Sequence, residues 1–343
     1  MKRTLKAIDL FAGCGGLSLG LRRAGFRVLL AIDADKLAAD TYKLNHPRTV
    51  VINDDITALN PTSVMADLGL RPGDLDLLAG CPPCQGFSRM RTLNGAREGD
   101  EAKNDLVWAF LAFAKIFRPK TIMLENVPGL SKDARFVGIQ AELKGLGYKL
   151  DHDVLNASDY GVPQSRNRLV LVGAKNFEPK LAPSEKSRRT VRQAISKLGQ
   201  PGTGSDALHD YQERRSNQVQ RIIDAIPIDG GSRSQLPDDL ILKCHRKSDG
   251  FKDVYGRMKW DFPSPTITGG CINPSKGRFL HPEQRRAITL REAALLQGFP
   301  RGYKFDLSRG RFPAAQMIGN AFPPRFAEKH AQRLALALGR DDV

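Results

Sequence analysis

The residues with the clearest chemical potential lie in one short stretch, residues 75–88, which reads LDLLAGCPPCQGFS. An apolar run ends there in Cys81, two prolines and Cys84. Two cysteines at this spacing are typical of a redox pair, of half a metal site, or of a loop that presents one nucleophilic thiolate. A redox pair normally has its first cysteine at a helix N-terminus, whereas the prolines and the following Gly predict a loop. We therefore rank a nucleophile first.

A metal site is the weakest of these three interpretations. Zinc needs a second pair of ligands at a short spacing, and Cys244 and Cys271 are too far apart in sequence to supply one. Cys14 already lies in a glycine-rich turn. A structural role for the thiols ranks second, and we predict no metal.

An acid and two guanidinium groups stand beside other apolar runs. Glu125 and Asn126 directly follow the run in MLENVPGL. Arg166 and Arg168 directly precede the run LVLVG. Ligands bind at the carboxyl edge of a parallel sheet, and Cys84 also follows a predicted strand there. Taken singly, these residues are explained as a helix cap or a solvated face, but together they indicate a site where a thiol, an acid and a guanidinium converge.

A glycine-rich turn, DLFAGCGG at residues 9–16, separates the first predicted strand from the first predicted helix. Glycine lets the backbone approach a ligand closely, and the helix N-terminus adds positive potential. Asp33 follows the second predicted strand, twenty residues beyond Gly13. A carboxylate at that place accepts hydrogen bonds from both hydroxyls of a ribose. The turn is not the full G-x-G-x-x-G, so the predicted nucleoside ligand need not be a dinucleotide.

Three residues near this turn are candidates for contact with an adenine, and each has a structural alternative. Phe11 is placed either to stack on the base or to serve as a core aromatic. Asp55 and Ile56 follow the third predicted strand, where they supply an adenine contact and an apolar wall, or else cap a helix.

The elements that must position these residues alternate between short apolar runs and amphipathic stretches. Continuous apolar strands separated by helices predict an α/β fold with a doubly wound, mainly parallel sheet. Besides the third strand, which precedes Asp55, the predicted strands are residues 5–11, 27–33, 75–80, 120–125, 148–157 and 166–174, and the predicted helices are residues 17–25, 35–46, 104–117, 134–147, 289–299 and 324–338.

The amino-acid composition indicates where the protein is located and what kind of molecule it binds. Five scattered cysteines, no cleavable signal peptide and no run long enough to cross a bilayer predict a cytoplasmic protein without a membrane partner. The formal net charge of +16 favours a polyanionic partner. Between residues 180 and 292, 21 Lys or Arg stand against 13 Asp or Glu, an excess of +8. This basic region is the one expected to meet the anion.

Six stretches resemble, in order, the motifs of the DNA (cytosine-5)-methyltransferases: DLFAGCGGLSLG, GCPPCQGFS, ENVPGL, DYGVPQSRNR, LREAALLQGFP and QMIGNAFPP. The resemblance runs from about residue 7 to residue 335. It implies the S-adenosylmethionine-dependent methyltransferase fold, S-adenosyl-L-methionine at the glycine turn, and double-stranded DNA with a cytosine flipped between two lobes. Pro, Gly and Ser accumulate among basic residues after about Glu178, which predicts a second, smaller domain at residues 181–285, between a first domain (1–180) and a C-terminal segment (286–343). The resemblance implies that the first domain is a catalytic and cofactor-binding domain, the second a target-recognition domain, and the C-terminal segment one that returns to the catalytic domain.

The resemblance also implies roles for individual residues. A Cys84 thiolate adds to C6 of cytosine, Glu125 acts at N3, Arg168 holds O2, and Gln85 lies in a loop over the DNA. The implied catalytic residues are Cys84, Gln85, Glu125, Arg166 and Arg168. The implied cofactor-binding residues are Asp9, Phe11, Ala12, Gly13, Gly15, Gly16, Asp33, Asp55, Ile56, Pro83 and Asn320.

Three residues depart from the pattern of the family. Asp33 stands where Glu is more usual, Ala34 where an aromatic often covers the adenine, and Phe322 where Val is usual. These departures concern the affinity for the cofactor and not the reaction.

Alternative functions remain open at this point. A tRNA cytosine-5 methyltransferase of the same fold is the nearest, although the long basic region and the GCPPCQGFS form favour DNA. An idle nucleic-acid-binding module leaves Cys84, Glu125 and Arg168 unexplained, and an NAD-dependent oxidoreductase leaves Pro-Cys-Gln unexplained. We expect a monomer. A cognate restriction endonuclease acting separately and the target sequence are left open, because no general code links recognition loops to base edges.

Overall fold

The computed structural model describes residues 3–83, 106–185, 187–211, 213–242, 246 and 253–341. Contacts between residues divide the chain into two compact units. The first unit consists of Met1–Tyr160, Asn167–Ser184 and Phe322–Val343, and the second of Gly161–Arg166 and Glu185–Ala321. The chain therefore passes from one unit to the other four times.

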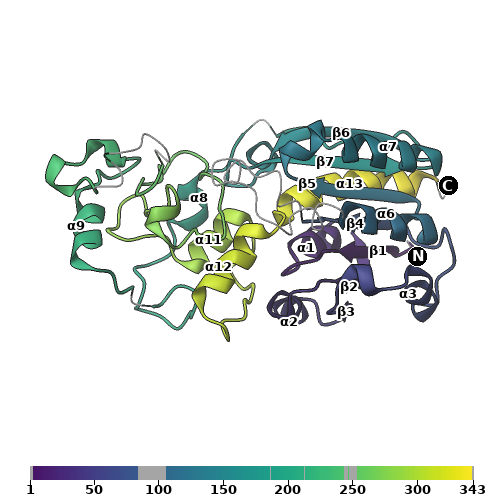
Figure 1. Cartoon of the computed structure of the whole chain (residues 1–343), viewed down its shortest axis with the longest axis horizontal. Helices are drawn as coiled ribbons and strands as arrows, with labels where there is room; N and C mark the ends of the chain where they lie inside the picture. The colour runs from purple at the N-terminus through teal and green to yellow at the C-terminus, as the bar shows by residue number, and fades with distance from the viewer. Residues whose placement is uncertain are drawn as a thin grey trace. The chain divides into compact units, whose positions relative to one another are not determined.

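A seven-stranded sheet organises the first unit, in the order β3-β2-β1-β4-β5-β7-β6 (Figure 1). Neighbouring strands are parallel except β5 with β7 and β6 with β7. Strands β4 and β5 are buried along their whole length, as expected of apolar runs covered on both faces. The strands are β1 (Leu5–Leu10), β2 (Phe26–Ile32), β3 (Val50–Ile52), β4 (Leu77–Gly80), β5 (Thr121–Asn126), β6 (Lys149–Asn156) and β7 (Asn167–Ala174). The predicted doubly wound, mainly parallel sheet is confirmed.

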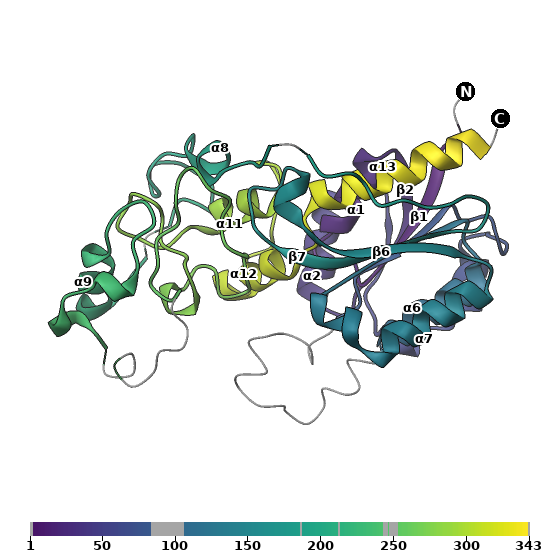
Figure 2. The ribbon, with the colours of Figure 1, turned by 90° about the horizontal axis from the view of Figure 1, so that it is seen from above.

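Helices cover both faces of this sheet. Figure 2 shows α1 and α13 on one side and α6 and α7 on the other. The helices of the first unit are α1 (Gly16–Arg23), α2 (Lys36–Asn45), α3 (Pro61–Asp67), α6 (Leu106–Phe117), α7 (Ala134–Gly145) and α13 (Pro324–Asp341), with the 3-10 turns η1 (Ile56–Ala58), η3 (Pro128–Lys132) and η4 (Ala157–Tyr160).

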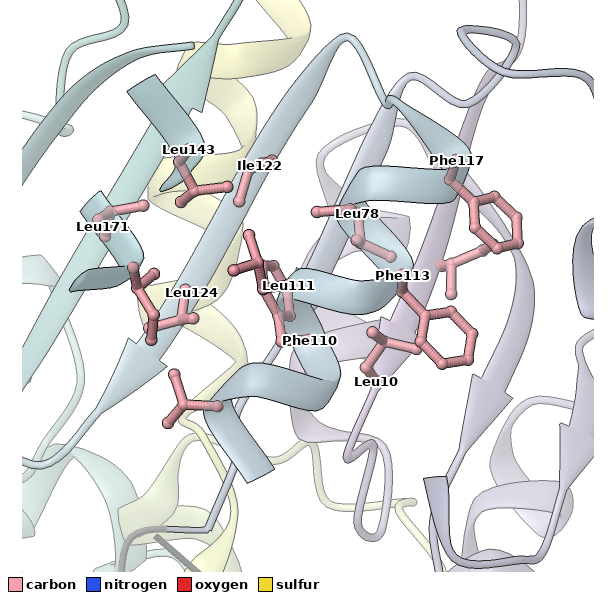
Figure 3. Packing of buried hydrophobic residues seen from close by; sticks show 14 of the residues in the cluster. Leu10, Leu78, Phe110, Leu111, Phe113, Phe117, Ile122, Leu124, Leu143 and Leu171 are labelled. Atoms are coloured by element: carbon pink, nitrogen blue, oxygen red, sulfur yellow. The ribbon is translucent and has the colours of Figure 1, made fainter. Parts of the chain in front are cut away.

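Helix α6 supplies much of the core of the first unit. Its Phe110, Leu111, Phe113 and Phe117 recur at helical spacing and are buried. Figure 3 shows them facing apolar side chains of β1, β4 and β5. Burial of such a side chain contributes about 1.5–3 kcal/mol. This packing holds together the strands whose carboxyl ends carry the predicted site.

Helices α1 and α13 approach closely because Gly20 has no side chain. A Cβ at Gly20 would lie 2.5 Å from the Pro324 carbonyl oxygen and 2.6 Å from Ala327 Cβ. We expect Gly20→Ala to lower the free energy of unfolding by about 1–3 kcal/mol, because overpacking forces the backbone to shift. The matched control is Gly145→Ala in α7, where a Cβ meets nothing within 4 Å. Urea unfolding of both variants tests this expectation, and equal stabilities would contradict it.

The second unit contains short helices joined by long connections. They are α8 (Val191–Ile195), α9 (Asn217–Ala225), α11 (Leu290–Gln297) and α12 (Arg311–Asn320), with the 3-10 turns η5 (Arg233–Gln235), η6 (Asp238–Leu240) and η7 (Pro274–Lys276). Helix α11 begins with a capping box between Thr289 and Glu292 and ends at Gly298, which has a φ of 96°. These start and stop signals are readable in the sequence.

A buried arginine ties the loops of the second unit together. Arg257 is 1% exposed, and its guanidinium donates to four main-chain carbonyls. The acceptors are Ile223, Ile226, His281 and Gln284. Hydrogen bonds from a side chain to the backbone thus satisfy buried carbonyls that a sheet would otherwise pair.

The boundaries of the compact units differ from those of the predicted domains. Residues 286–321 of the predicted C-terminal segment belong to the second unit, and the chain joins the first unit again at Phe322. Compact units are defined by contacts and the predicted domains by function, so the recognition role of residues 181–285 stays a prediction. No helix in the described part of the chain is long and apolar enough to cross a membrane.

Candidate active site

An ion pair stands where β5 ends. Arg168 Nε lies 2.8 Å from Glu125 Oε1, and both side chains are largely shielded from solvent. The antiparallel register places Val170 opposite Glu125, and residues two apart on a strand share a face. Arg168 is therefore the diagonal neighbour of Glu125 across the two strands. Arg168 Nη1 also donates to the Asn167 carbonyl at 2.7 Å, so the guanidinium is held in one orientation.

The end of β4 brings Cys81 to the same acid. Gly80 pairs with Leu124 in the parallel register, so the residues that follow these two, Cys81 and Glu125, are neighbours at the carboxyl edge. The Cys81 thiol hydrogen-bonds to the Glu125 carboxylate. Burial, and then the negative charge of Glu125, raise the pKa of this thiol well above its ordinary value. A protonated thiol is a poor nucleophile, so Cys81 does not fit that role.

The loop that leads toward the predicted nucleophile is anchored to β5. Asn126 Nδ2 donates to the Pro82 carbonyl at 3.0 Å, and Asn126 is buried. Pro83 follows Pro82 and is the last residue described before the gap. Cys84 and Gln85 lie outside the described residues.

Arg166 has a different environment from Arg168. It belongs to the second unit, is 3% exposed, and donates to the carbonyls of Ile267 at 3.0 Å and Gly319 at 2.9 Å. Both acceptors are main-chain atoms. The catalytic role of Arg166 stays a prediction.

The glycine turn follows β1 directly. Phe11, Gly13 and Gly15 all have positive φ, at 60°, 54° and 93°. A Cβ at Gly13 would meet nothing within 4 Å, so its backbone conformation, not a lack of space, favours glycine there. The Gly15 amide donates to the Ala12 carbonyl at 2.9 Å, and Gly16 begins α1. The turn thereby joins a strand to a helix N-terminus, as predicted.

Asp33 lies next to this turn, at the end of β2. The Gly13 amide donates to its Oδ2 at 2.7 Å, and the Asp35 amide donates to its Oδ1 at 2.9 Å. Burial raises the pKa of Asp33, and these two amides oppose the rise. The carboxylate is thus oriented by the backbone on both sides.

A buried polar chain lies beneath the turn. The Tyr42 hydroxyl donates to Ser18 Oγ, and Ser18 Oγ donates to Asp9 Oδ2, each at 2.6 Å. Burial raises the pKa of Asp9 to about 7. The other oxygen, Oδ1, is buried and has no hydrogen-bond partner among the described residues. Sequence reasoning missed Ser18 and Tyr42, because a Ser and a Tyr on two helices carry no signal that they will meet.

The three adenine candidates have structural roles in the first unit. The Asp55 carboxylate caps η1, accepting from the amide and hydroxyl of Thr57 at 2.9 and 2.8 Å. Ile56 is buried in the hydrophobic core of the first unit, and the partly buried Phe11 packs against this core. The alternatives of a cap and a core residue are therefore present, while contact with adenine stays a prediction. Asn320 is the exposed last residue of α12, in the second unit.

Within the described ranges no group of three or more His, Cys, Asp or Glu residues is arranged to hold a metal ion.

Comparison with known proteins gives consistent matches over nearly the whole chain. Residues 5–335 match the C-5 cytosine-specific DNA methylase family. The type II methylase M.HgiDII of Herpetosiphon aurantiacus is 39% identical over 92% of this chain and 91% of its own. The type II methyltransferase M1.HphI of Haemophilus parahaemolyticus is 34% identical over 96% and 86%.

Solved structures agree with the fold. A prophage-encoded protein of E. coli, assigned as a DNA modification methyltransferase, superposes with a TM-score of 0.70 at 26% identity, covering 97% of this chain and 99% of its own. The Dnmt2 methyltransferase of S. pombe gives a TM-score of 0.61 at 21% identity, covering 99% and 100%. The likeness to the S. pombe structure concerns the fold alone.

Proposed function

Because the chain belongs to the C-5 cytosine-specific DNA methylase family, it is a DNA (cytosine-5)-methyltransferase, and we propose that it acts on a flipped cytosine through a covalent bond from Cys84. The observation that carries the proposal is the Glu125–Arg168 pair at the carboxyl edge of the sheet. The segment Pro82–Pro83 that precedes Cys84 is anchored to Asn126, the neighbour of Glu125. An acid, a guanidinium and the approach to a thiol thus share one edge.

Cys84, Glu125 and Arg168 each have a separate role in the proposed reaction. C5 of cytosine is a poor nucleophile while the ring is aromatic. When the Cys84 thiolate adds to C6, the S–C6 bond forms and the electron pair moves toward N3, where Glu125, as the carboxylic acid, delivers a proton. C5 then has enamine character and takes up a methyl group. The C5 proton then passes to a base, the S–C6 bond breaks with its electron pair going to sulfur, and N3 returns its proton to the Glu125 carboxylate, which restores the ring and the thiolate. Arg168 would hold O2 throughout.

S-adenosyl-L-methionine is the proposed methyl donor, and when bound it supplies an electrophilic methyl group on a cationic sulfur. The residues at the glycine turn fit such a cation. Asp33 is an oriented carboxylate, and Asp9 Oδ1 is a buried acceptor without a partner among the described residues. The residues proposed to hold it are Asp9, Phe11, Ala12, Gly13, Gly15, Gly16, Asp33, Asp55, Ile56, Pro83 and Asn320.

Asp33→Asn tests this cofactor site. We expect the Kd for S-adenosyl-L-methionine to rise by about tenfold or more, because a hydrogen bond to a charged group contributes about 1.5–3 kcal/mol. Isothermal titration calorimetry without DNA measures it. Asp40→Asn is the matched control, since it removes the same charge from α2, where Asp40 pairs with Lys36 and Lys43. Equal affinities in the two variants would remove Asp33 from the site.

Double-stranded DNA is the proposed substrate form, bound by a monomer. The +8 excess between residues 180 and 292 supports phosphate binding there, which sets affinity, while a few side chains read base edges. The target carbon is inaccessible inside a stacked duplex, so base flipping is expected. A restriction endonuclease with the same target sequence is a candidate partner that acts separately.

Two measurements test the proposed function. Bisulfite sequencing of DNA from cells that express the protein should show C5-methylated cytosine in one short sequence. Purified protein with labelled S-adenosyl-L-methionine should label duplex DNA and not tRNA. Label in tRNA alone would favour the alternative substrate and overturn the proposal.

A further inference from the structure

Arg166 lies at the centre of a small buried network in the second unit. Its guanidinium joins the Ile267 carbonyl to the Gly319 carbonyl, at 3.0 and 2.9 Å. Ile267 lies in the TIT segment 266–268, and Gly319 lies in the last turn of α12. One buried cation therefore ties together two segments that are about fifty residues apart. Because its hydrogen bonds go to the backbone, Arg166 constrains main-chain positions directly.

Two buried glutamines extend this network. Gln164 Oε1 accepts from the Ile267 amide at 2.8 Å, and Gln164 Nε2 donates to Gln297 Oε1. Gln297 Nε2 in turn donates to the Ala321 carbonyl. Both glutamines are fully buried. We call Gln164, Arg166 and Gln297 the clasp.

The clasp holds the residues on both sides of Asn320. Arg166 binds the Gly319 carbonyl and Gln297 binds the Ala321 carbonyl. Carbonyls at a helix C-terminus have no hydrogen-bond partner within the helix. Arg166 and Gln297 therefore supply donors to carbonyls at the end of α12 that the helix itself does not satisfy. Asn320 itself is exposed. The clasp thus fixes the backbone of Asn320 and leaves its side chain available.

Close packing adds to this constraint. A Cβ at Gly319 would lie 2.2 Å from the Thr268 carbonyl carbon and 2.3 Å from the Gly269 amide nitrogen. The last turn of α12 therefore rests directly on the backbone of the TIT segment. The Gly319 carbonyl also accepts a hydrogen bond from Arg166, so close packing and a hydrogen bond act on the same residue.

We propose that Arg166 is a positioning residue that acts through Asn320 on the binding of S-adenosyl-L-methionine. The proposal rests on the proposed function, in which Asn320 contacts the amino-acid end of the cofactor. Without Arg166 the Gly319 carbonyl loses its cationic donor and the end of α12 can move. The Asn320 amide then spends less time in the orientation that binds the cofactor.

Calorimetric titration with S-adenosyl-L-methionine, without DNA, measures the effect apart from catalysis. Arg166→Lys keeps the positive charge but loses the planar guanidinium that binds two carbonyls at once. We expect the Kd of this variant for S-adenosyl-L-methionine to rise about tenfold, which is within the range of coupling between neighbouring residues. Arg257→Lys is the matched control, since Arg257 is a buried arginine of the same unit that also donates to main-chain carbonyls. Its Kd should stay unchanged. Thermal unfolding of both variants shows whether their losses of stability are comparable.

A double-mutant cycle with Asn320→Ala separates the outcomes. If Arg166 acts through Asn320, Arg166→Lys should weaken binding no further in the Asn320→Ala background. If Asn320→Ala alone leaves Kd unchanged, the proposed role of Asn320 fails. If Asn320→Ala weakens binding and Arg166→Lys does not, or if the two effects multiply, the positioning role of Arg166 is wrong.

A second variant keeps the test possible should Arg166→Lys fail to fold. Gln297→Met has a similar volume and removes the donor to the Ala321 carbonyl. We expect the same direction of change in Kd, about threefold to tenfold, again absent in the Asn320→Ala background. An unchanged Kd in folded Gln297→Met would contradict the proposal that the clasp positions Asn320.

Discussion

Wild-type protein mixed with S-adenosyl-L-methionine and duplex DNA that carries 5-fluorocytosine at the target is expected to give an adduct that resists denaturation, and Cys84→Ser is expected to give none. Release of the DNA requires loss of the substituent on C5 as a cation. Hydrogen can leave in this way, whereas fluorine cannot, so methyl transfer occurs and elimination stalls. A hydroxyl is far less ionised and less nucleophilic than a thiol, so the serine variant should not add to C6. Denaturing gel electrophoresis detects the adduct.

Cys81→Ser is the matched control for this experiment. This variant makes the same replacement of sulfur by oxygen, three residues before Cys84. In the wild type, burial and the charge of Glu125 raise the pKa of the Cys81 thiol and keep it protonated. The serine hydroxyl can still donate to Glu125, so adduct formation should remain close to that of the wild type. Peptide mapping should place the linkage at Cys84. A normal adduct in Cys84→Ser, or a linkage at Cys81, contradicts the assignment of the nucleophile.

Glu125→Gln is expected to lower the rate of methyl transfer by about 10²- to 10⁴-fold, the range for loss of a general acid. The amide is nearly isosteric and can still hydrogen-bond, but it has no proton to deliver to N3. Single-turnover transfer of labelled methyl to duplex DNA measures the rate separately from product release. The affinity for S-adenosyl-L-methionine should not change, because the proposed cofactor residues are different ones.

Glu142→Gln provides the control for Glu125→Gln. Glu142 also pairs with a cation, Lys115, at 2.8 Å, but about half of each side chain is exposed. Exposed ion pairs contribute about 0–1 kcal/mol, so both stability and rate should be close to those of the wild type. If Glu125→Gln keeps more than about a tenth of the wild-type rate, general acid catalysis by Glu125 is not supported.

The fold of the first unit could be predicted because its strands are continuous apolar runs and its helices are amphipathic. The run LDLLAG, for example, ends in β4 (Leu77–Gly80), which is buried along its length. The second unit was harder to predict because buried side-chain hydrogen bonds join its long connections, and such bonds leave no periodic pattern in the sequence. Arg257 appears in the sequence as one more basic residue, yet it is buried and binds four carbonyls.

The candidate site was only partly predictable for the same reason. Strand order places Glu125 and Arg168 at one edge, and the structure pairs them. Arg166 stands two residues from Arg168 in the same motif, but it belongs to a different compact unit. The motif alone cannot separate a residue that faces the site from one that binds main-chain carbonyls. The contact between Cys81 and Glu125 also required the register of β4 against β5.

The four crossings of the chain between its two units limit which continuous segments relatives can exchange by recombination. An exchange of residues 185–321 between relatives would import the TIT segment, Gln297 and Gly319. It would leave behind Gln164 and Arg166, which belong to the same unit but lie before β7. A recombinant would then take Gln164 and Arg166 from one parent, and Gln297 together with Ile267, Gly319 and Ala321 from the other. None of the clasp residues or of the acceptors named above lies among the described residues of 185–263, so an exchange limited to this stretch keeps those contacts within one parent.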